Sequence, residues 1–345
     1  MSSEKTPRVS VVLPVRNAAG TVARAIASIR TQTYPGWELI AVDDGSTDGT
    51  REVLRRLAGG EPRMTIIERE HAGVAGAANA AMALAKGEWI ARMDADDESH
   101  PERLAAQVEF LQAAAHRDVG VVGSLVEFGG DRDVGEGYAR HVDWVNSLVT
   151  PEAIALNRFV EAPLANPSVM FRRELLVRHG GYRDGDFPED YELWLRWLDA
   201  GVRMAKVPRV LLTWHDAPTR LTRTDARYDP EAFFRVKALW IAREVARIAG
   251  GRAVWAWGAG RPARKRSAHL APHGVTIAGY IDVDAKKTGR GIGGTGPPVI
   301  APGALPPPGT ILVLGYVARR GVREDVRERL HARGYVEGRD FLMCA

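Results

Sequence analysis

The first 93 residues alternate short apolar runs with segments whose apolar residues recur at helical spacing. This alternation predicts right-handed βαβ units, in which helices cover both faces of a mostly parallel sheet. The fold class that we expect is therefore α/β. The expected strands are residues 8–15, 37–42, 64–67 and 88–93, and the expected helices are residues 18–30, a segment that begins near residue 48, and residues 74–85.

Polar residues follow three of these strands directly. Pro14-Val15-Arg16-Asn17, Asp43-Asp44 and Asp94-Ala95-Asp96 each stand at the carboxyl end of an apolar run. In open parallel sheets, ligands bind beyond the carboxyl ends of the strands. We therefore expect these three segments to meet at one edge of the sheet and to form a binding site there.

The acidic end of the fourth run carries the strongest chemical signal. Asp94, Asp96 and Asp97 fall within four positions. Like charges this close repel one another, and burial would raise their pKa values. A hard cation such as Mg²⁺ or Mn²⁺ removes that penalty and binds substrate phosphate in the rest of its shell. The segment predicts a site for a metal–diphosphate, and the alternative is a solvated acidic turn that caps the next helix.

The order and spacing of these motifs resemble those of the family 2 glycosyltransferases, and the resemblance extends to about residue 215. It implies a nucleotide-sugar-binding domain of the GT-A fold. The matching segments are Val9-Ser10-Val11-Val12-Leu13-Pro14 with Asn17, Val42-Asp43-Asp44-Gly45-Ser46-Thr47-Asp48-Gly49-Thr50, Gly73-Val74 with Asn79, Gly87-Glu88-Trp89-Ile90, Asp94-Ala95-Asp96-Asp97, Pro167-Ser168-Val169-Met170-Phe171-Arg172, Gly180-Gly181-Tyr182 and Glu189-Asp190-Tyr191-Glu192-Leu193-Trp194.

The resemblance implies a role for each matching residue at the donor side. Asp44 would contact the base of a nucleotide-diphosphate-sugar donor, with Asp43 beside it. Asp94 would lie near the ribose and the metal ion, and Asp96 would be the direct metal ligand. The donor would also contact the segment after the first strand, through Pro14, Val15 and Asn17.

On the acceptor side, the resemblance implies that Asp190 is the general base. A single displacement at the anomeric carbon inverts its configuration and needs one base, which takes the proton from the acceptor hydroxyl. A metal ion would neutralise the departing diphosphate. The alternative for Asp190 is structural, because acidic residues in the first turn of a helix complement the helix dipole.

Two further positions leave alternatives open. Arg16 stands where the family often has an aromatic ring against the base, and a guanidinium can also stack on a base. His215 follows a strand pattern at residues 209–213. Some GT-A enzymes use a late histidine as an additional metal ligand, and the alternative is an exposed or hydrogen-bonded histidine.

A second α/β pattern follows these motifs. A helix is expected from Pro230 to Ile248, with strands at residues 253–257, 275–281, 311–314 and 341–343, a helix at residues 319–332, and a long loop at residues 289–308. This part resembles small Rossmann-like modules of sugar-modifying enzymes. The predicted domains are a GT-A domain at residues 1–228, a connecting helix at residues 229–250 and a Rossmann-like accessory domain at residues 251–345.

The loop after the first strand of the accessory domain has the spacing of a dinucleotide-binding fingerprint. Gly258-Ala259-Gly260-Arg261-Pro262-Ala263 reads Gly-x-Gly-x-x-Ala, and Asp282 follows about 20 positions later. We therefore expect Gly258, Gly260 and Asp282 to bind a ligand.

Four basic residues crowd the helix that is expected after this loop. Cations at the start of a helix oppose its dipole, and a bound phosphate would reverse that penalty. The alternatives are a solvated basic face and a basic face that docks against acidic residues of the first domain. The residues are Arg261, Arg264, Lys265 and Arg266.

Composition limits the compartment and the partners. Cys344 is the single cysteine, which excludes an intrachain disulfide and fits a reducing cytoplasm. Residues 1–8 lack an apolar signal core, and no apolar run approaches the ~20 residues of a membrane helix. We expect a cytoplasmic protein whose pI of about 9.3 suits peripheral association with the inner face of the membrane. A net charge of +4 does not argue for a nucleic-acid partner.

We therefore predict an inverting, Mn²⁺- or Mg²⁺-dependent glycosyltransferase. The expected donor is a nucleotide-diphosphate sugar, first of all a UDP-sugar, and the expected acceptor is a saccharide or a lipid-linked molecule. One alternative is a sugar-1-phosphate nucleotidyltransferase, but residues 14–20 do not supply its Gly-rich, Lys-bearing phosphate loop. The other is a non-catalytic nucleotide-sugar sensor or scaffold, which would not need Asp94, Asp96 and Asp190.

Overall fold

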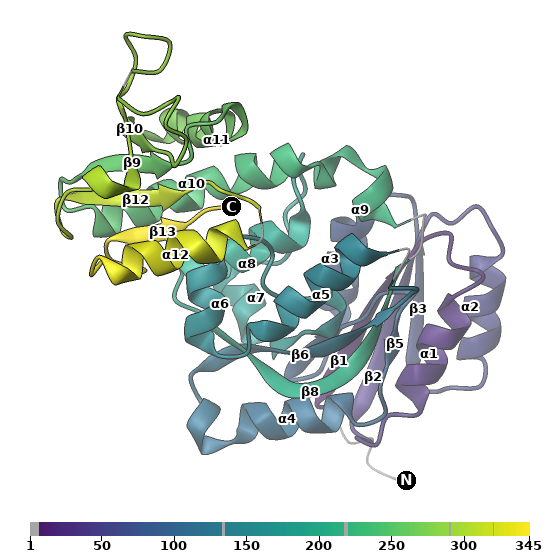
Figure 1. Ribbon diagram of the computed structural model, residues 1–345. Coiled ribbons are helices and arrows are strands. Elements are labelled where there is room, and N and C mark those ends of the chain that lie inside the picture. The colour runs from purple at the N-terminus through teal and green to yellow at the C-terminus, as the bar shows by residue number, and fades with distance from the viewer. Residues whose placement is uncertain (1–6, 133–134, 217–219, 290, 320) are drawn as a thin grey trace. The chain divides into compact units, whose positions relative to one another are not determined.

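The computed structural model describes residues 7–132, 135–216, 220–289, 291–319 and 321–345 (Figure 1). The chain divides into two compact units. The first unit comprises the chain up to residue 155, with residues 163–185 and 192–224. The second unit comprises residues 156–162, 186–191 and 225–345. Two short segments thus belong with the second unit, which the sequence pattern did not indicate, and the domain boundaries expected from the sequence stay a prediction.

The first unit is built around an eight-stranded sheet. Its strands are β1 (Val9–Val15), β2 (Trp37–Asp44), β3 (Met64–Arg69), β4 (Trp89–Arg92), β5 (Glu98–Ser99), β6 (Val119–Gly129), β7 (Met170–Arg172) and β8 (Arg203–His215). They lie in the order β3-β2-β1-β4-β7-β6-β8-β5. The first four are mutually parallel, whereas β7 is antiparallel to both of its neighbours and β5 is antiparallel to β8. The prediction of an α/β fold with a mostly parallel sheet is confirmed.

Helices cover both faces of this sheet. The helices between residues 22 and 224 are α1 (Val22–Arg30), α2 (Thr50–Ala58), α3 (Gly73–Leu84), α4 (Arg103–Gln112), α5 (Glu136–Ser147), α6 (Pro151–Asn157), α7 (Glu174–His179), α8 (Glu189–Asp199) and α9 (Leu221–Thr224). Successive strand side chains point to opposite faces. On β1, Val11 packs in the core that includes α1, α2 and α4, whereas Val12 packs in the core that includes α3. Trp194 and Trp197 of α8 belong to this second core, as their apolar spacing suggests.

The second unit contains a five-stranded sheet. Its elements are α10 (Pro230–Ile248), β9 (Ala253–Trp257), α11 (Arg261–Ser267), β10 (Ile277–Ile281), β11 (Val299–Ile300), β12 (Ile311–Gly315), α12 (Val322–Ala332) and β13 (Phe341–Met343). The strands are all parallel, in the order β11-β10-β9-β12-β13. The strand order reverses beside β9, which is the topology of doubly wound nucleotide-binding sheets.

Two expectations about the second unit can be compared with its elements. The helix from Pro230 to Ile248 forms as expected, with Pro230 in its first turn, where a missing N–H costs little. The interpretation of residues 289–308 as a loop alone was wrong, because Val299 and Ile300 pair with β10. A strand of two residues is too short to show an alternating pattern in the sequence. Across the described residues, no helix combines the length and apolarity that crossing a bilayer requires.

Gly87 permits a close approach between the start of β4 and β1. A Cβ atom at this position would lie 2.7 Å from the Ser10 nitrogen and 2.9 Å from the Arg8 carbonyl oxygen. Backbone atoms in a sheet cannot move aside cheaply, so we expect Gly87→Ala to lower the free energy of unfolding by about 1–3 kcal/mol. Chemical denaturation would measure this change.

Gly20→Ala is the matched control, because a Cβ atom at Gly20 would meet nothing within 4 Å. We expect its free energy of unfolding to stay within about 0.5 kcal/mol of the wild-type value. Equal stabilities of the two variants would contradict the close approach at Gly87.

Candidate active site

The segments that follow β1 and β2 lie against each other at the carboxyl edge of the first sheet. Pro14 and Val15 end β1, and Val15 pairs with Asp43. Asn17 has a left-handed backbone with a φ of 48°. Its backbone N–H donates to the Ser46 hydroxyl at 3.0 Å, and its side-chain oxygen accepts from the Thr47 N–H at 2.9 Å. The structure thus brings together two of the three segments that the sequence analysis assigned to one binding edge.

Asp44 organises the loop after β3. Its carboxylate accepts from the backbone N–H groups of Ala72 and Gly73, each at 2.9 Å, and from His71 Nδ1 at 2.6 Å. His71 Nε2 lies 2.9 Å from Arg16 Nη1. A guanidinium can only donate, so Nε2 accepts and Nδ1 carries the proton that points to Asp44. Sequence reasoning missed His71, because no motif marks it.

Asp43 is fully buried and its two carboxylate oxygens differ. Oδ2 accepts from Arg51 Nε at 2.6 Å and from the Ser46 N–H at 3.4 Å. Oδ1 is buried and has no hydrogen-bond partner among the residues that the structure describes. A buried carboxylate oxygen without a donor is unfavourable.

The acidic cluster follows β4 directly. One carboxylate oxygen from each of Asp94, Asp96 and Asp97 lies within 4.8 Å of the others. Asp97 is buried, its Oδ1 accepts from the His215 backbone N–H at 2.8 Å, and its Oδ2 has no partner among the described residues. Burial and then the neighbouring carboxylates raise the pKa of Asp96, and they raise the pKa of Asp97 well above its usual range. Oxygen ligands in this arrangement fit Mg²⁺ or Mn²⁺.

Three arginines accompany the acidic cluster. Arg92 is only 2% exposed and forms an ion pair with Asp94 at 2.6 Å. Arg103 is fully buried and donates to the Arg92 carbonyl oxygen at 2.6 Å, and burial lowers the pKa of Arg103 to about 9. Arg220 donates to the Tyr138 hydroxyl. Burial alone would lower the pKa of Arg220, but Tyr138 and the acidic cluster outweigh burial and raise that pKa.

Sequence reasoning missed these arginines. The position of Arg92 inside an apolar run was a usable signal, because a charged residue in a buried strand needs a partner. No local pattern marks Arg103 or Arg220, since their partners are distant in the sequence.

His215 lies at the end of β8, beside Asp97. Its ring atom Nε2 is 2.7 Å from Glu98 Oε1, and Nδ1 is 3.1 Å from the Gly129 carbonyl oxygen. Both ring nitrogens thus face protein acceptors, which is the arrangement of a hydrogen-bonded histidine. Its role as a metal ligand stays a prediction.

Asp190 is the second residue of α8 and lies in the segment that belongs to the second unit. Its Oδ1 accepts from the Tyr191 backbone N–H at 2.7 Å. The residues on either side are anchored: the Tyr228 hydroxyl donates to Glu189 Oε2 at 2.6 Å, and the buried Tyr191 donates to the Arg158 carbonyl oxygen at 2.7 Å. The backbone that carries Asp190 is therefore fixed on both sides.

The glycine loop of the second unit, residues 258–260, is hydrogen-bonded to Asp282, the acidic residue expected near it. Gly258 has a φ of +111°, and its N–H donates to the Ile281 carbonyl oxygen at 2.7 Å. Asp282 follows β10, and its Oδ2 accepts from the Ala259 N–H at 2.9 Å. Gly260 follows and precedes α11. The structure thus brings Gly258, Gly260 and Asp282 together at the carboxyl ends of β9 and β10.

Comparison with known proteins identifies the class. The family model "Glycosyl transferase family 2" matches residues 10–180. The chain is 34% identical over 204 residues to EpsE of Bacillus subtilis (strain 168), and the matched region spans 57% of this chain and 69% of EpsE. It is 30% identical over 196 residues to WfgD of Escherichia coli, and the matched region spans 55% of this chain and 69% of WfgD. WfgD is a UDP-Glc:alpha-D-GlcNAc-diphosphoundecaprenol beta-1,3-glucosyltransferase.

Solved structures agree on the fold. TarS 1–349 of S. aureus, in complex with UDP-GlcNAc, has a TM-score of 0.56 at 20% identity and covers 77% of this chain and 71% of its own. The mannosyltransferase PcManGT from Pyrobaculum calidifontis, in complex with GDP-Man and Mn²⁺, has a TM-score of 0.50 at 25% identity, with 78% and 70% covered. The fold is that of a GT-A glycosyltransferase. The chain belongs to glycosyltransferase family 2 and uses a nucleotide sugar, as the sequence motifs predicted.

The acidic cluster predicts a stability that depends on divalent cations. We expect Mn²⁺ at 100 times its Kd to raise the free energy of unfolding by about 2.7 kcal/mol. Metal binding displaces protons from carboxyl groups whose pKa values are raised, so the gain should be smaller near about pH 5.5 than near about pH 7.5. Thermal unfolding with Mn²⁺ and with EDTA would measure it.

Asp96→Ala should lose this stabilisation. Asp143→Ala is the matched control, because Asp143 is exposed on α5 and pairs with Arg132. It should keep the full gain. The same gain in Asp96→Ala as in the wild type would exclude a metal ion at the cluster.

Proposed function

We propose that this chain is an inverting, metal-dependent glycosyltransferase that transfers a sugar from a UDP-sugar to a hydroxyl group of a saccharide or lipid-linked acceptor. The observation that carries the proposal is the cluster of Asp94, Asp96 and Asp97 at the end of β4, with one buried carboxylate oxygen that lacks a partner among the described residues. Such a cluster is unfavourable unless a cation accompanies it.

For the donor base, we assign the direct contact to Asp44, with Asp43 beside it. Asp44 holds the loop after β3 through three hydrogen bonds, and the fully buried Asp43 forms an ion pair with Arg51. Arg16, held by His71, offers a planar guanidinium on which a base can stack. The UDP-GlcNAc complex of TarS and the UDP-Glc donor of WfgD support a uridine nucleotide.

For the diphosphate, we assign the metal ion to Asp96 and Asp94. When bound, Mn²⁺ or Mg²⁺ neutralises the charge that develops on the departing diphosphate. Arg92 orients Asp94 through their ion pair, and the His215 backbone N–H orients Asp97. The Mn²⁺ in the PcManGT complex supports this choice of ion.

For the acceptor, we assign the general base to Asp190. The acceptor oxygen forms a bond to the anomeric carbon as the bond from that carbon to the diphosphate oxygen breaks, and the hydroxyl proton passes to the Asp190 carboxylate. This single displacement inverts the anomeric configuration. Anchoring of Glu189 by Tyr228, together with the buried Tyr191, keeps the carboxylate in place.

For the acceptor's nature, WfgD offers the best guide among the relatives, since its acceptor is a diphosphoundecaprenol-linked sugar. A lipid-linked acceptor of this kind would bring the protein to the inner face of the cytoplasmic membrane. The basic pI of about 9.3 suits association with anionic headgroups there.

Asp190→Asn tests the assignment of the base. Asparagine keeps the shape of the side chain but cannot take a proton at neutral pH. We expect the transfer rate to fall by roughly 10²–10⁴-fold, the usual worth of a positioned base, with the affinity for donor and metal unchanged. Transfer kinetics and donor titration would measure the two quantities separately.

Asp186→Asn provides the matched control, because Asp186 is an exposed carboxylate four residues earlier in the same segment. It should transfer at the wild-type rate. An Asp190→Asn enzyme that is as fast as this control would leave Asp190 as a carboxylate that only complements the start of α8.

A further inference from the structure

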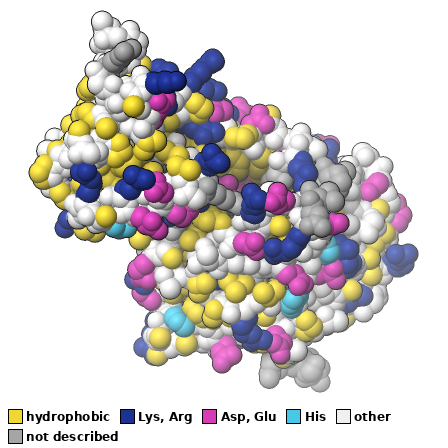
Figure 2. Space-filling model, in the orientation of Figure 1, with side chains coloured by type: hydrophobic (Ala, Val, Ile, Leu, Met, Phe, Trp, Pro, Cys, Tyr) yellow, Lys and Arg dark blue, Asp and Glu magenta, His cyan; other side chains and the backbone are white. Residues whose placement is uncertain are grey.

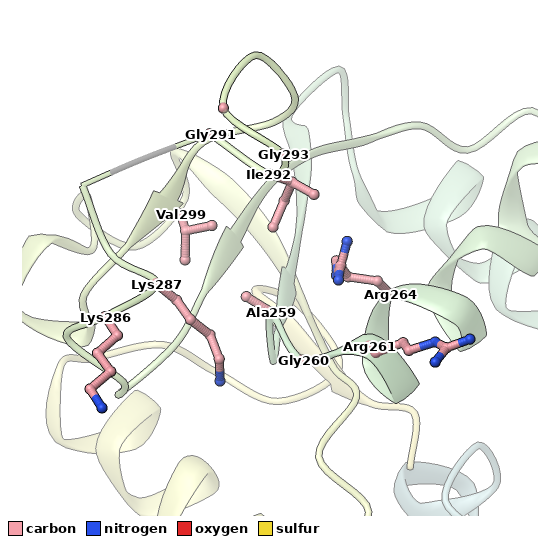
Figure 3. Close-up of a pocket in the computed structure, with 11 residues that line it drawn as sticks. Ala259, Gly260, Arg261, Arg264, Lys286, Lys287, Gly291, Ile292, Gly293 and Val299 are labelled. Atoms are coloured by element: carbon pink, nitrogen blue, oxygen red, sulfur yellow. The ribbon is translucent and has the colours of Figure 1, made fainter.

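The second unit contains a pocket of about 380 Å³ beside the glycine loop after β9 (Figure 3). Ala259 and Gly260 form one side of it, and the glycine-rich segment 291–294 forms another. Among the described residues, no carboxylate lines this pocket, whereas four cations do: Arg261, Arg264, Lys286 and Lys287.

The four basic residues of α11 divide into two pairs, and Figure 2 shows Lys and Arg side chains gathered over this helix. Lys265 and Arg266 form ion pairs with Glu231 of α10, at 3.2 and 3.6 Å. Within the described part of the chain, Arg261 and Arg264 have no ion-pair partner, and the buried Nε of Arg264 has no acceptor. The two cations of α11 outside the pocket thus share one carboxylate, whereas the two inside it have no ion-pair partner among the described residues.

The two lysines of the pocket also differ. Lys287 is balanced by Asp282 and Asp284, at 3.2 and 3.4 Å. Lys286 is exposed and has no ion pair within the residues described. Lys286 therefore adds to the uncompensated positive charge of Arg261 and Arg264.

Asp282 argues against a dinucleotide such as NAD. In dinucleotide-binding folds, the equivalent acidic residue binds a ribose hydroxyl. Here Asp282 is only 8% exposed, and it accepts from the N–H groups of Ala259 and Asp284, each at 2.9 Å, besides its ion pair with Lys287. Its carboxylate serves to hold the loop.

The pocket also offers an apolar surface. Ile292 and Val299 line it, and in Figure 3 the Arg264 side chain rises from α11 toward Ile292. Cations beside an apolar wall fit a ligand that carries both phosphate and a flat ring. The volume is within the usual range for small-molecule sites, which is roughly 300–1,000 Å³.

We propose that this pocket binds a nucleoside diphosphate, either free or as part of a nucleotide sugar. The phosphates lie beside Arg264, with Lys286 at the opposite side of the pocket, and the ring lies against Ile292. Gly260, where a Cβ atom would meet only Pro262 Cδ at 3.8 Å, leaves the backbone open to a phosphate. None of these residues belongs to the acidic cluster, so the chain would carry a second nucleotide site beyond the transfer reaction.

Calorimetry of the full chain tests this proposal. UDP, UDP-glucose, NAD and inorganic phosphate are titrated in the presence of Mn²⁺. We expect two binding events per chain for UDP or UDP-glucose. Lys286→Glu should weaken one event at least roughly tenfold, because a reversed charge repels the phosphate at short range. Comparing UDP with UDP-glucose shows whether the pocket binds the free nucleotide or the sugar-linked one, because only the ligand that fits the pocket produces both events.

Lys265→Glu is the matched control, since Lys265 carries the same charge on α11 but pairs with Glu231 outside the pocket. It should keep both events. Arg264→Gln, a milder change at the pocket, should weaken the same event as Lys286→Glu. Asp96→Ala should weaken the other event, so a failure of the donor site and a failure of this pocket give different results.

Three outcomes would overturn the proposal. They are a single event that only Asp96→Ala affects, an equal response of Lys286→Glu and Lys265→Glu, and binding of NAD or inorganic phosphate with no second event for either uridine nucleotide.

Discussion

Repulsion among three neighbouring carboxylates is the constraint on which the carboxyl edge of the first unit depends. Asp94, Asp96 and Asp97 follow a buried strand, and burial raises the pKa values of the last two. The protein offsets part of that charge with arginines that would themselves be unfavourable if they were alone: Arg92 is 2% exposed, and the pKa of Arg103 falls to about 9. These buried cations hold the cluster in place, and a divalent cation would complete the balance.

The sheet explains why the cluster lies along the same edge as the segments that follow β1 and β2. Because β1, β2 and β4 are parallel neighbours, their carboxyl ends lie along one edge. The chain turns after β1 at Asn17, whose left-handed backbone is unfavourable for a residue with a side chain. Hydrogen bonds to Ser46 and Thr47 hold Asn17 in this conformation. The same strand order, which the apolar cores on both faces of the sheet stabilise, thus places the residues that we assign to donor and metal binding along one edge.

Local patterns predicted much of this arrangement. The alternation of apolar runs and helical segments predicted the parallel strands β1 to β4, and the acidic segment after β4 predicted the carboxylate cluster. Both signals lie within a few consecutive residues. His71 and Arg220 were not predicted, since each acts through partners more than 25 positions away, Asp44 and Tyr138. Only the structure reveals that the Asp44 carboxylate accepts hydrogen bonds from the loop after β3, and that one buried oxygen of Asp43 has no partner among the described residues. Strand β11 escaped notice because two residues make no pattern.

The central claim is that the acidic cluster supports inverting transfer from a nucleotide sugar. Its most direct measurement is the release of nucleoside diphosphate from a panel of nucleotide sugars, with Mn²⁺ and with EDTA, together with the anomeric configuration of the glycoside product by NMR. We predict release from at least one UDP-sugar, loss of that release on chelation, and a product whose anomeric configuration is opposite to that of the donor. Turnover that survives chelation, or a product that retains the donor's configuration, would contradict it.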